Sequence, residues 1–377
     1  MASLLPLNQA RWKVPSVPRR YLVILVTISV ILFLVFQHHS TFSHLREDHW
    51  GIKAKPTRPL FAPGTVKPSG SQYSQTLVLP RLRSENIDWI ARELPNIQTA
   101  IYTVDDEGAP LRPPSNKGHE AMVYLTYIID NYDKLSDTSI FVHSHRRAWH
   151  NNDLLDGDMV KMVRRLSNER VAREGYFNLR CHPHPGCPNW ISLNVTKEDI
   201  NKKEEVVFPT IWDELYPGQP MPDVLAQPCC GQFAASRARL QSIPLSQWNH
   251  FRDWLLKTDL RDALSGRIFE YTWQYMLTGH SSLCVPMNEC YCDGYGVCFG
   301  SAQKCAAWFD LREDKRKLDV EMHEAREKGQ ATDKLDHRIT DAEREMRRRT
   351  EEALTCGDDP RCRAEEMGRP WKEGDGF

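Results

Sequence analysis

The chain has 377 residues, of which 41% are hydrophobic and 26% are charged. This length and composition allow a real core in one large domain or in two ordinary ones. Its 49 Lys and Arg are balanced by 50 Asp and Glu, and without a basic excess we do not expect a nucleic-acid partner.

Residues 21–36, YLVILVTISVILFLVF, form an uncharged run that basic residues precede and that no Lys or Arg follows until Arg46. The positive-inside rule then predicts a cytosolic tail at 1–20, an anchor at 21–37 and a lumenal remainder. A signal peptide would have a similar charge layout, but no small-residue cleavage pattern follows the run. The run is short against the roughly 20 residues of a full span, which suits thin early secretory membranes. We therefore predict a single-pass type II protein of the Golgi or endoplasmic reticulum membrane.

The cysteines and one glycosylation sequon support this topology. All eleven cysteines lie beyond the run, as expected in an oxidising lumen where disulfides persist. The sequon Asn194-Val195-Thr196 lies on the predicted lumenal side, so we expect Asn194 to be glycosylated.

Residues 38–75 hold Pro, Gly and Ser without apolar periodicity and predict a flexible stem, and a lumenal domain follows at 76–308. The β-α-β-α-β order of its first elements predicts an α/β fold with a doubly wound, mostly parallel sheet. These elements are a strand at 76–79, a helix at 85–94, a strand at 100–104, an amphipathic helix at 118–135 and a buried strand at 138–142.

The rest of the domain is less regular. Helices are expected at 154–167, 245–258 and 260–277, and strands at 176–180 and 204–208. Five cysteines lie between Cys284 and Cys305, and because their spacing is not CxxC we expect a disulfide-rich cap in place of a zinc site. Two further pairs, Cys181 with Cys187 and Cys356 with Cys362, are expected to close small loops.

The tail at 309–377 is charge-dense, and narrow apolar stripes on either side of Gly329 predict two helices. Such stripes leave two interpretations open: a surface hairpin resting on its own domain, or self-association into a homodimer. We expect the tail to be removable without unfolding the domain.

Six ordered stretches resemble the fungal domain-of-unknown-function family 3431, over roughly residues 76–298. They are GHEAMVYLTYIIDNYDKL, IFVHSHRRAWHNND, GYFNLRCHPHPGCP, PCCGQFAASR, SGRIFEYTWQYML and CYCDGYGVC. This resemblance implies a family without implying a reaction. The blocks QFAASR and SGRIFEYTW also resemble the acceptor-side portions of lumenal glycosyltransferases of the nucleotide-sugar-binding GT-A fold, which implies a GT-A-like sheet and makes Gln232 a candidate substrate-binding residue.

The predicted active site lies at the carboxyl end of the 138–142 strand, where ligands bind in open parallel sheets. His143 and His145 lie two residues apart, so on a strand their side chains would point the same way. Together with His150 or Asp153 they could bind Mn²⁺ or Zn²⁺, and the alternative is that they bond loop carbonyls or pair with Asp. The metal motif usual in GT-A enzymes, Asp-x-Asp, occurs in the lumenal part only at residues 156–158, where a helix cap is favoured.

Four further residues are candidates for substrate binding. Asp105 and Asp106 end the second strand and could accept hydrogen bonds from a sugar hydroxyl, or serve as turn residues. Arg81 could bind a phosphate as a bidentate donor. Glu120 is interpreted either as a group that complements its helix's positive end or as a ligand group.

Glu270 lies in an apolar helical block, and a carboxylate in such surroundings has a raised pKa and can act as a general base. An ion pair with Arg267 is the competing interpretation. Trp273, in the same block, could stack on a sugar ring.

The sequence therefore predicts a lumenal glycosyltransferase-like enzyme that transfers a sugar from a nucleotide donor to a glycan or glycoprotein acceptor. Two alternatives remain: a non-enzymatic binding or scaffold protein of the same fold, and a metal-dependent hydrolase that uses the histidine cluster.

Overall fold

The structure is a computed structural model, and it describes residues 61–195 and 197–377. The predicted cytosolic tail, the anchor and most of the stem lie outside the described residues, and these assignments stay predictions. No helix in the described ranges is long and apolar enough to cross a membrane.

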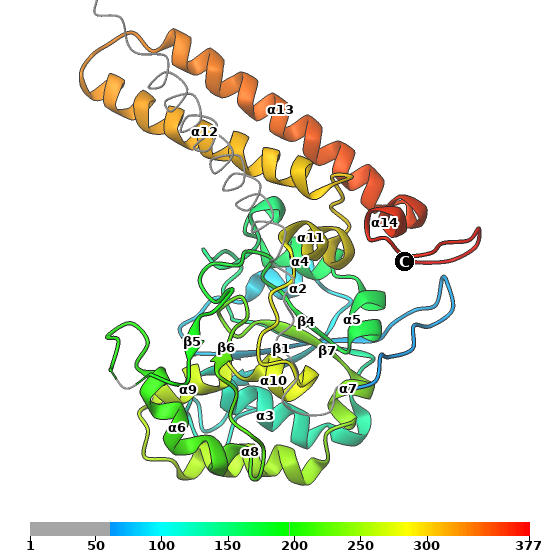
Figure 1. Ribbon diagram of the computed structural model, residues 1–377, viewed down its shortest axis with the longest axis vertical. Helices are drawn as coiled ribbons and strands as arrows, with labels where there is room; N and C mark the ends of the chain where they lie inside the picture. Colours follow the sequence, from blue (N-terminus) through cyan, green and yellow to red (C-terminus); the bar gives the residue numbers. More distant parts are fainter. Residues whose placement is uncertain (1–60, 196) are drawn as a thin grey trace, which may run out of the picture. The chain divides into compact units, whose positions relative to one another are not determined.

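A five-stranded mixed sheet forms the centre of the domain, in the order β2-β1-β3-β7-β4 (Figure 1). β1 pairs in parallel with β2 and β3, whereas β7 runs antiparallel to both β3 and β4. The predicted α/β class and mostly parallel sheet are therefore confirmed, with β7 as the one reversed strand of this sheet. The strands are β1 (Gln75–Arg81), β2 (Gln98–Thr103), β3 (Thr138–Phe141), β4 (Tyr176–Asn178) and β7 (Phe233–Ser236).

The first half of the domain follows the predicted β-α-β-α-β order. Helix α2 (Asp88–Glu93) connects β1 to β2, and α3 (Glu120–Asp130) connects β2 to β3. α3 ends earlier than its apolar stripe suggested, at Asn131, whose side-chain amide donates to the carbonyl of Tyr127 at 2.9 Å.

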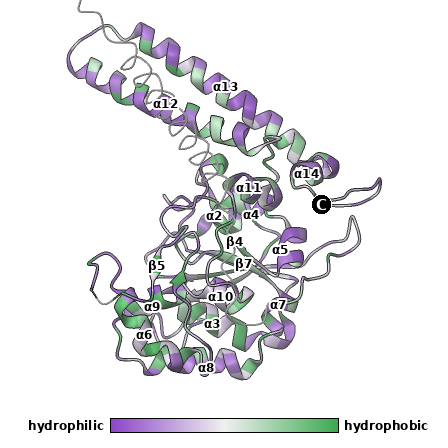
Figure 2. Ribbon diagram, viewed as in Figure 1, coloured by the Kyte–Doolittle hydropathy of each residue, from purple (hydrophilic) through white to green (hydrophobic). Residues whose placement is uncertain are grey.

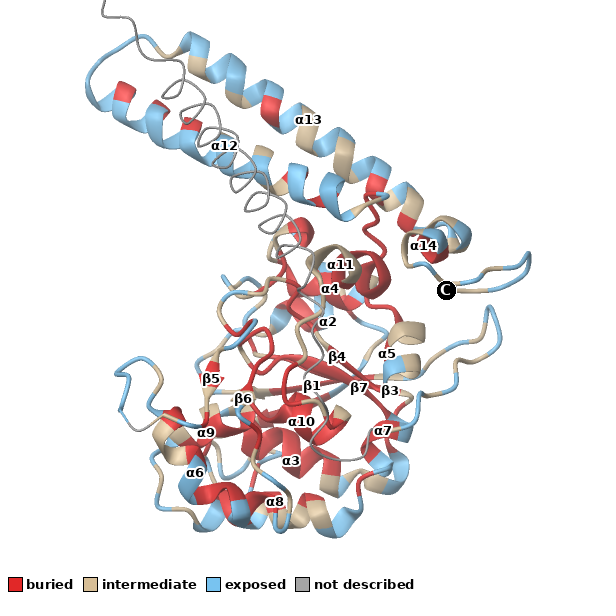
Figure 3. Ribbon diagram, in the orientation of Figure 1, coloured by how far each residue is buried: buried red, intermediate tan, exposed pale blue. Residues whose placement is uncertain are grey.

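Both faces of the sheet are buried, which explains why the third strand shows no polar alternation. Ile140 and Val142 pack in a cluster with α2, α4 (Met159–Arg165) and α11 (Met287–Tyr295). Phe141, which points the other way, packs in a second cluster. That cluster contains residues of α3, α8 (Leu245–Lys257), α9 (Asp262–Glu270) and α10 (Trp273–Thr278), and Figure 3 shows both buried layers.

Three predicted elements are corrected. The segment predicted as a strand at 204–208 is the start of helix α6 (Glu204–Leu215), because Phe208, Ile211, Trp212 and Leu215 repeat at helical spacing and are buried. The predicted helix at 154–167 is broken by left-handed backbone at Asp156 and Gly157, after the short 3₁₀ turn η2 (Asp153–Leu155). The predicted helix at 260–277 is divided into α9 and α10. The remaining elements before the C-terminal region are the 3₁₀ turn η1 (Tyr132–Lys134), α5 (Asn168–Glu174), α7 (Arg237–Gln241), β5 (Ile191–Ser192) and β6 (Val224–Leu225).

Five disulfides brace the described part of the domain, and the predicted Cys356–Cys362 loop is one of them. The predicted pairing of Cys181 with Cys187 is wrong, because each joins a distant cysteine of the cap instead of its neighbour in the loop. Cys305 is free and buried. The pairs are Cys181–Cys290, Cys187–Cys284, Cys229–Cys230, Cys292–Cys298 and Cys356–Cys362.

The C-terminal region contains the predicted helical hairpin, α12 (Ala302–Glu327) and α13 (Asp333–Gly357), followed by α14 (Pro360–Glu366). Figure 2 shows that the hairpin is mostly hydrophilic. Its base is not, since Trp308 is buried in the cluster around α4 and α11, and Phe309 packs against that cluster. The expected domain boundary at 309 therefore falls inside α12.

A buried carboxylate also joins the C-terminal region to the domain. Asp293 of α11 is 2% exposed and forms ion pairs with Arg170 at 2.6 Å, Arg173 at 2.7 Å and Arg369 at 2.9 Å. Burial alone would raise the pKa of Asp293, but these three arginines lower it to about 2. The stem likewise ends on the domain, where Gly64 donates its backbone N–H to the carbonyl of Arg173.

Candidate functional site

The candidate site lies at the sheet edge where β1, β2, β3 and β4 end and β7 begins. His143 follows β3 by two residues, Arg180 follows β4 by two, and Gly231 precedes β7 by two. Because β7 is antiparallel, its first residues meet the last residues of its neighbours, and Phe233 pairs with both Phe141 and Asn178. The edge therefore brings together three segments that are far apart in the sequence.

His143 joins the end of β3 to the turn before β7. Its Nε2 lies 2.7 Å from the carbonyl oxygen of Cys230, and its backbone N–H donates to the side-chain oxygen of Gln232 at 3.1 Å. Since a carbonyl can only accept, Nε2 carries the proton and Nδ1 keeps its lone pair. Burial lowers the pKa of His143, so the ring is neutral at pH 7.

Glu270 is the last residue of α9, and its carboxylate accepts a hydrogen bond from the backbone N–H of Cys230 at 2.6 Å. Burial raises the pKa of Glu270 to about 7, the Cys230 hydrogen bond opposes this shift, and the nearby carboxyl of Glu120 adds to it. The competing interpretation, an ion pair with Arg267, is not observed, because Arg267 instead pairs with Glu204 at 2.9 Å.

Glu120 approaches the same turn from the start of α3. A Cβ atom added to Gly231 would lie only 2.7 Å from the Glu120 carboxylate, so Gly231 is what allows this approach. Burial raises the pKa of Glu120. The two carboxyl groups thus flank adjacent residues of one turn, each in surroundings that favour its protonated form.

The backbone around these carboxyl groups is strained. His119, just before Glu120, has φ 51°, and Cys230 has φ 85°, both in the left-handed region that side chains other than glycine's rarely occupy. Cys230 is bonded to its neighbour Cys229, a link that adds a covalent constraint to the turn. Strain of this kind persists only where surrounding contacts enforce it, and it is common at functional sites.

A second group of side chains lies beside His143. The ring of His150 is 5.1 Å from that of His143, and the ring of Trp149 is 5.6 Å from that of His150, measured between centroids. The guanidinium carbon of Arg180 lies 5.1 Å from the Trp149 ring. Burial, His143 and Arg180 together lower the pKa of His150 to about 4. We call Arg180, Trp149, His150, His143, Cys230, Glu270 and Glu120 the edge site.

The predicted four-residue metal set is not assembled. β3 ends at Phe141, so strand alternation does not align His143 with His145, and His145 instead lies 3.6 Å from Glu85. Asp153 pairs with Arg312 at 2.7 Å. Within residues 61–195 and 197–377, the groups of three ligand atoms within 4.8 Å are Cys229, Cys230 and Glu270, and Cys292, Cys298 and Glu366. The cysteines of both groups are in disulfides, which leaves no thiolate for Mn²⁺ or Zn²⁺.

The candidate substrate-binding residues at the ends of β1 and β2 form hydrogen bonds within the loops that follow these strands. Arg81 donates to the carbonyls of Leu82 and Arg83 in its own loop. Asp105 accepts from the backbone N–H of Arg83 at 2.9 Å, and Asp106 accepts from that of Gly108 at 2.9 Å. These aspartates therefore act as loop and turn residues, which is one of the two roles expected for them.

Two other candidates are buried. Gln232 is 2% exposed, and it bridges His143 to Asn151 through its side-chain amide, so it positions the loop after β3. Trp273 is 0% exposed, and its ring lies 5.0 Å from that of Phe233 in the core. Stacking of Trp273 on a substrate is therefore inconsistent with the structure. Trp149 is the tryptophan of the edge site that is exposed, with 69% of its surface accessible. The sequence signal that could have identified it is its position among the histidines that follow the third strand.

Two expectations concern loop residues. Asp158 accepts from the backbone N–H of Val160 and is the N-cap of α4, so the cap interpretation of the Asp-x-Asp is confirmed. Asn194 is exposed, and its amide donates to Asp223 at 2.6 Å. This exposure is compatible with glycosylation, which stays a prediction.

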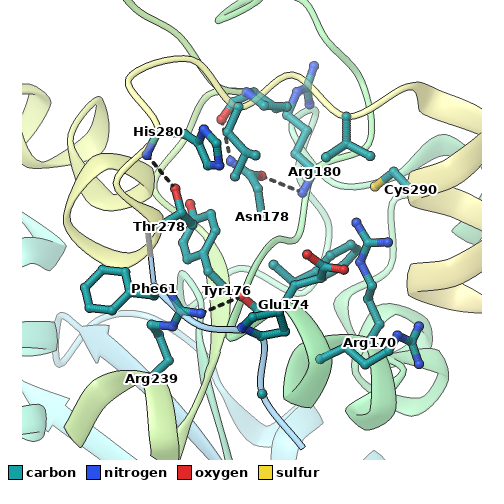
Figure 4. A pocket seen from close by; sticks show the side chains of 17 residues that line it. Phe61, Arg170, Glu174, Tyr176, Asn178, Arg180, Arg239, Thr278, His280 and Cys290 are labelled. Atoms are coloured by element: carbon teal, nitrogen blue, oxygen red, sulfur yellow. Dashed lines mark hydrogen bonds between the residues drawn. The ribbon is translucent and has the colours of Figure 1, made fainter. Parts of the chain in front are cut away.

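A cavity of about 340 Å³ lies next to the edge site (Figure 4). Its wall includes Asn178 and Pro228, the residue before Cys229. Arg170 and Arg173, also in the wall, are neutralised by Asp293. Arg180 also lines this cavity, whereas Glu270 and His143 do not, so the cavity adjoins the Arg180 end of the edge site.

The fold and the site together define a disulfide-braced mixed α/β domain with carboxyl and imidazole groups at the carboxyl edge of its sheet. The chain belongs to the family described as protein of unknown function (DUF3431), whose model matches residues 77–293. This match confirms the family suggested by the sequence blocks. No curated protein and no solved structure matches the chain.

Proposed function

We propose that this protein is a lumenal glycosyltransferase-like enzyme, with Glu270 as its general base. The observation that carries the proposal is the raised pKa of Glu270, about 7, in a carboxyl group held by the Cys230 N–H at the edge of the sheet. A base whose pKa lies near the working pH is the most effective for proton transfer.

The proposed reaction needs one proton acceptor. The Glu270 carboxylate takes the proton of an acceptor hydroxyl, whose oxygen then forms a bond to the anomeric carbon of the donor sugar. The bond between that carbon and the phosphate oxygen breaks, and the nucleoside diphosphate leaves with the electron pair. A glycan or glycoprotein would supply the hydroxyl.

The sheet supports a nucleotide-binding role of the GT-A kind. The chain goes from β1 outward to β2 and then to β3 on the other side of β1, so the loops after β1 and β3 diverge. Ligands of open α/β sheets bind at such a switch point, and His143 follows β3 there. The loop that precedes the reversed strand β7 carries Cys230 and Gly231, and we assign this loop to the acceptor side of the site.

A donor screen tests the proposal. Full-length protein in detergent is heated with UDP-, GDP- and CMP-sugars, each with and without Mn²⁺, and active donors are then assayed for release of the nucleotide. Stabilisation by one donor class together with turnover supports the transferase. Stabilisation by metal alone would favour a metal-dependent hydrolase, and no response to any ligand would favour the scaffold.

A further inference from the structure

We propose that Arg180, His150 and Trp149 bind the diphosphate of the donor without a metal ion. This inference rests on the proposed function, because it assigns the leaving group of that reaction to one end of the edge site. The opposite end holds Glu270 and Glu120.

Arg180 is a buried cation that forms no ion pair with a carboxylate of residues 61–195 or 197–377. It is 6% exposed, and its guanidinium donates to two carbonyls, of His184 at 2.9 Å and of Trp149 at 3.4 Å. Its Nε has no hydrogen-bond partner among the described residues. Asp153, the acid whose charge acts on it most, is already paired with Arg312 at 2.7 Å. A buried charge without a partner is costly, which favours an anionic ligand here.

Other buried arginines of the domain are held differently. Arg239, also 6% exposed, donates to the carbonyls of Leu277, Ala62 and Glu174. Arg363 lies against Asp293, whose charge acts on it. Arg363 and Arg180 both have a buried Nε without a hydrogen-bond partner among the described residues, and of the two it is Arg180 that lies beside the candidate catalytic groups.

His150 supplies a second polar group at the same place. Its Nε2 is buried and has no hydrogen-bond partner in the described ranges. Because burial, His143 and Arg180 lower the pKa of His150 to about 4, the ring is neutral and can donate one N–H without adding a second buried charge. Both side chains contact Trp149, and their two unsatisfied nitrogens match the several acceptor oxygens of a phosphate.

Trp149 adds an aromatic surface over this pair. It is 69% exposed, stacks against the Arg180 guanidinium and lies edge-on to His150. An exposed indole held by a buried cation offers a flat face to the base or sugar ring of a nucleotide. The guanidinium fork below it fits the diphosphate.

The order of the residues fits the proposed transfer. From Arg180 the contacts run through Trp149, His150 and His143 to the Cys230 carbonyl, and Cys230 donates to Glu270. The anion site and the base therefore lie on one continuous row of side chains. The same region lacks an assembled set of metal ligands from His143, His145, His150 and Asp153.

Calorimetric titration in EDTA tests this proposal directly. The full-length protein in detergent is titrated with inorganic pyrophosphate, UDP and GDP. We expect one of these anions to bind, and Arg180→Lys to weaken that binding about tenfold or more, since lysine keeps the charge but loses the fork. Trp149→Ala should weaken nucleotide binding and leave pyrophosphate binding unchanged.

Arg147→Met serves as the matched control. Arg147 belongs to the same loop, is 63% exposed and pairs with Asp158, so its loss should change binding less than about twofold. Trp149→Ala removes an exposed side chain and keeps the test valid should Arg180→Lys misfold. Anion binding that requires added Mn²⁺, that is absent altogether, or that neither variant changes would overturn the proposal.

The two proposals can fail separately. If anions bind through Arg180 but no sugar donor is turned over, the anion site stands and the transferase does not. If donors are turned over while Arg180→Lys and Trp149→Ala bind them normally, the transferase stands and the anion site does not.

Discussion

Glu270 and Glu120 meet one turn of the chain from two different helices, and the turn is built to receive them. Gly231 leaves the space that the Glu120 carboxylate occupies, and Cys230 donates its backbone N–H to Glu270. Burial raises the pKa of both carboxyl groups, and the nearby Glu120 raises that of Glu270 further, so both hold protons at higher pH than free glutamate. This arrangement, and not any single residue, makes Glu270 a suitable base near neutral pH.

The pKa of Glu270 makes a prediction about stability. Folding raises this pKa from 4.5 to about 7, so between these values the folded state binds more protons than the unfolded state. The contribution of Glu270 to stability is therefore complete below pH 4.5 and is lost as pH rises through 7. We expect Glu270→Gln to flatten this part of the pH profile of the free energy of unfolding, measured by urea denaturation. An unchanged slope between these pH values would show that Glu270 ionises normally.

At single positions, the sequence predicted chemistry better than it predicted accessibility. Glu270 was chosen for its apolar neighbours, and those neighbours raise its pKa in the structure. Trp273 lies in the same block, but the sequence alone does not show that α10 is buried over five consecutive residues, including Trp273. Arg180 and Cys230 were not predicted, because what singles them out is an unpaired guanidinium Nε and a left-handed backbone, neither of which a sequence pattern reveals.

At the scale of elements, the first strands and helices were predicted because several local signals agreed. A buried strand such as β3 is short and lacks polar alternation, and its neighbours have clear periodicity. Helix α6 was misread because Val206 and Val207 are β-branched and Pro209 interrupts the pattern, whereas the buried stripe that decides the matter appears only further along. Distant disulfides such as Cys181–Cys290 are set by tertiary contacts and could not be derived from spacing.

Asp293 is expected to be the most sensitive polar residue of the α5, α11 and α14 junction. Asp293→Asn leaves the half-buried Arg170, Arg173 and Arg369 without the buried carboxylate that pairs with them, so we expect a loss of about 3–5 kcal/mol in the free energy of unfolding at pH 7. Its pKa is lowered, so this contribution is present above pH 3.8 and is lost as pH falls through about 2.

A matched control for Asp293 is available on the hairpin. Asp314→Asn removes an exposed carboxylate paired with Lys317, and it should cost less than about 1 kcal/mol. If the two variants unfold at the same denaturant concentration, the ion pairs of Asp293 with its three arginines do not stabilise the fold.

For the whole molecule, the hairpin is expected to contain a dispensable tip and an essential base. Lys315 and Glu343 pair across the two helices at 3.1 Å, so a short Gly-Ser linker can replace residues 316–342. We expect this change to cost less than about 1 kcal/mol, because the tip packs mainly on itself. Deletion of 309–377 should instead give aggregated protein, since it removes Phe309 and Arg369 from their buried partners.

Size-exclusion chromatography and chemical denaturation distinguish these two variants. A cooperative transition in the 309–377 deletion would contradict an essential role of the hairpin's base.

The tip variant also tests the predicted homodimer: if full-length protein is dimeric and the tip variant is monomeric, the hairpin mediates association. Buried Leu318, Met322 and Ala325 are already covered, which leaves less of the apolar stripe for a partner.

The predicted type II topology is tested in microsomes. We expect a carboxyl-terminal tag to resist protease until detergent is added, because the domain would lie in the lumen. Asn194 is exposed, so the wild-type protein should lose mass on treatment with an N-glycosidase and Asn194→Gln should not. Digestion of the tag in intact microsomes would place the domain on the other side of the membrane.

The central claim, that Glu270 is the base of a sugar transfer, is tested most directly by the pH dependence of nucleoside diphosphate release at saturating donor and acceptor. The wild-type rate should fall on acidification with an apparent pKa near 7, the value that burial gives Glu270. In Glu270→Gln the fall in rate on acidification, the acid limb of the profile, should be absent. The kcat of this variant should be lower by about 100-fold or more, and its affinity for the donor should be unchanged. A Glu270→Gln enzyme that keeps both the wild-type kcat and the acid limb would contradict the account.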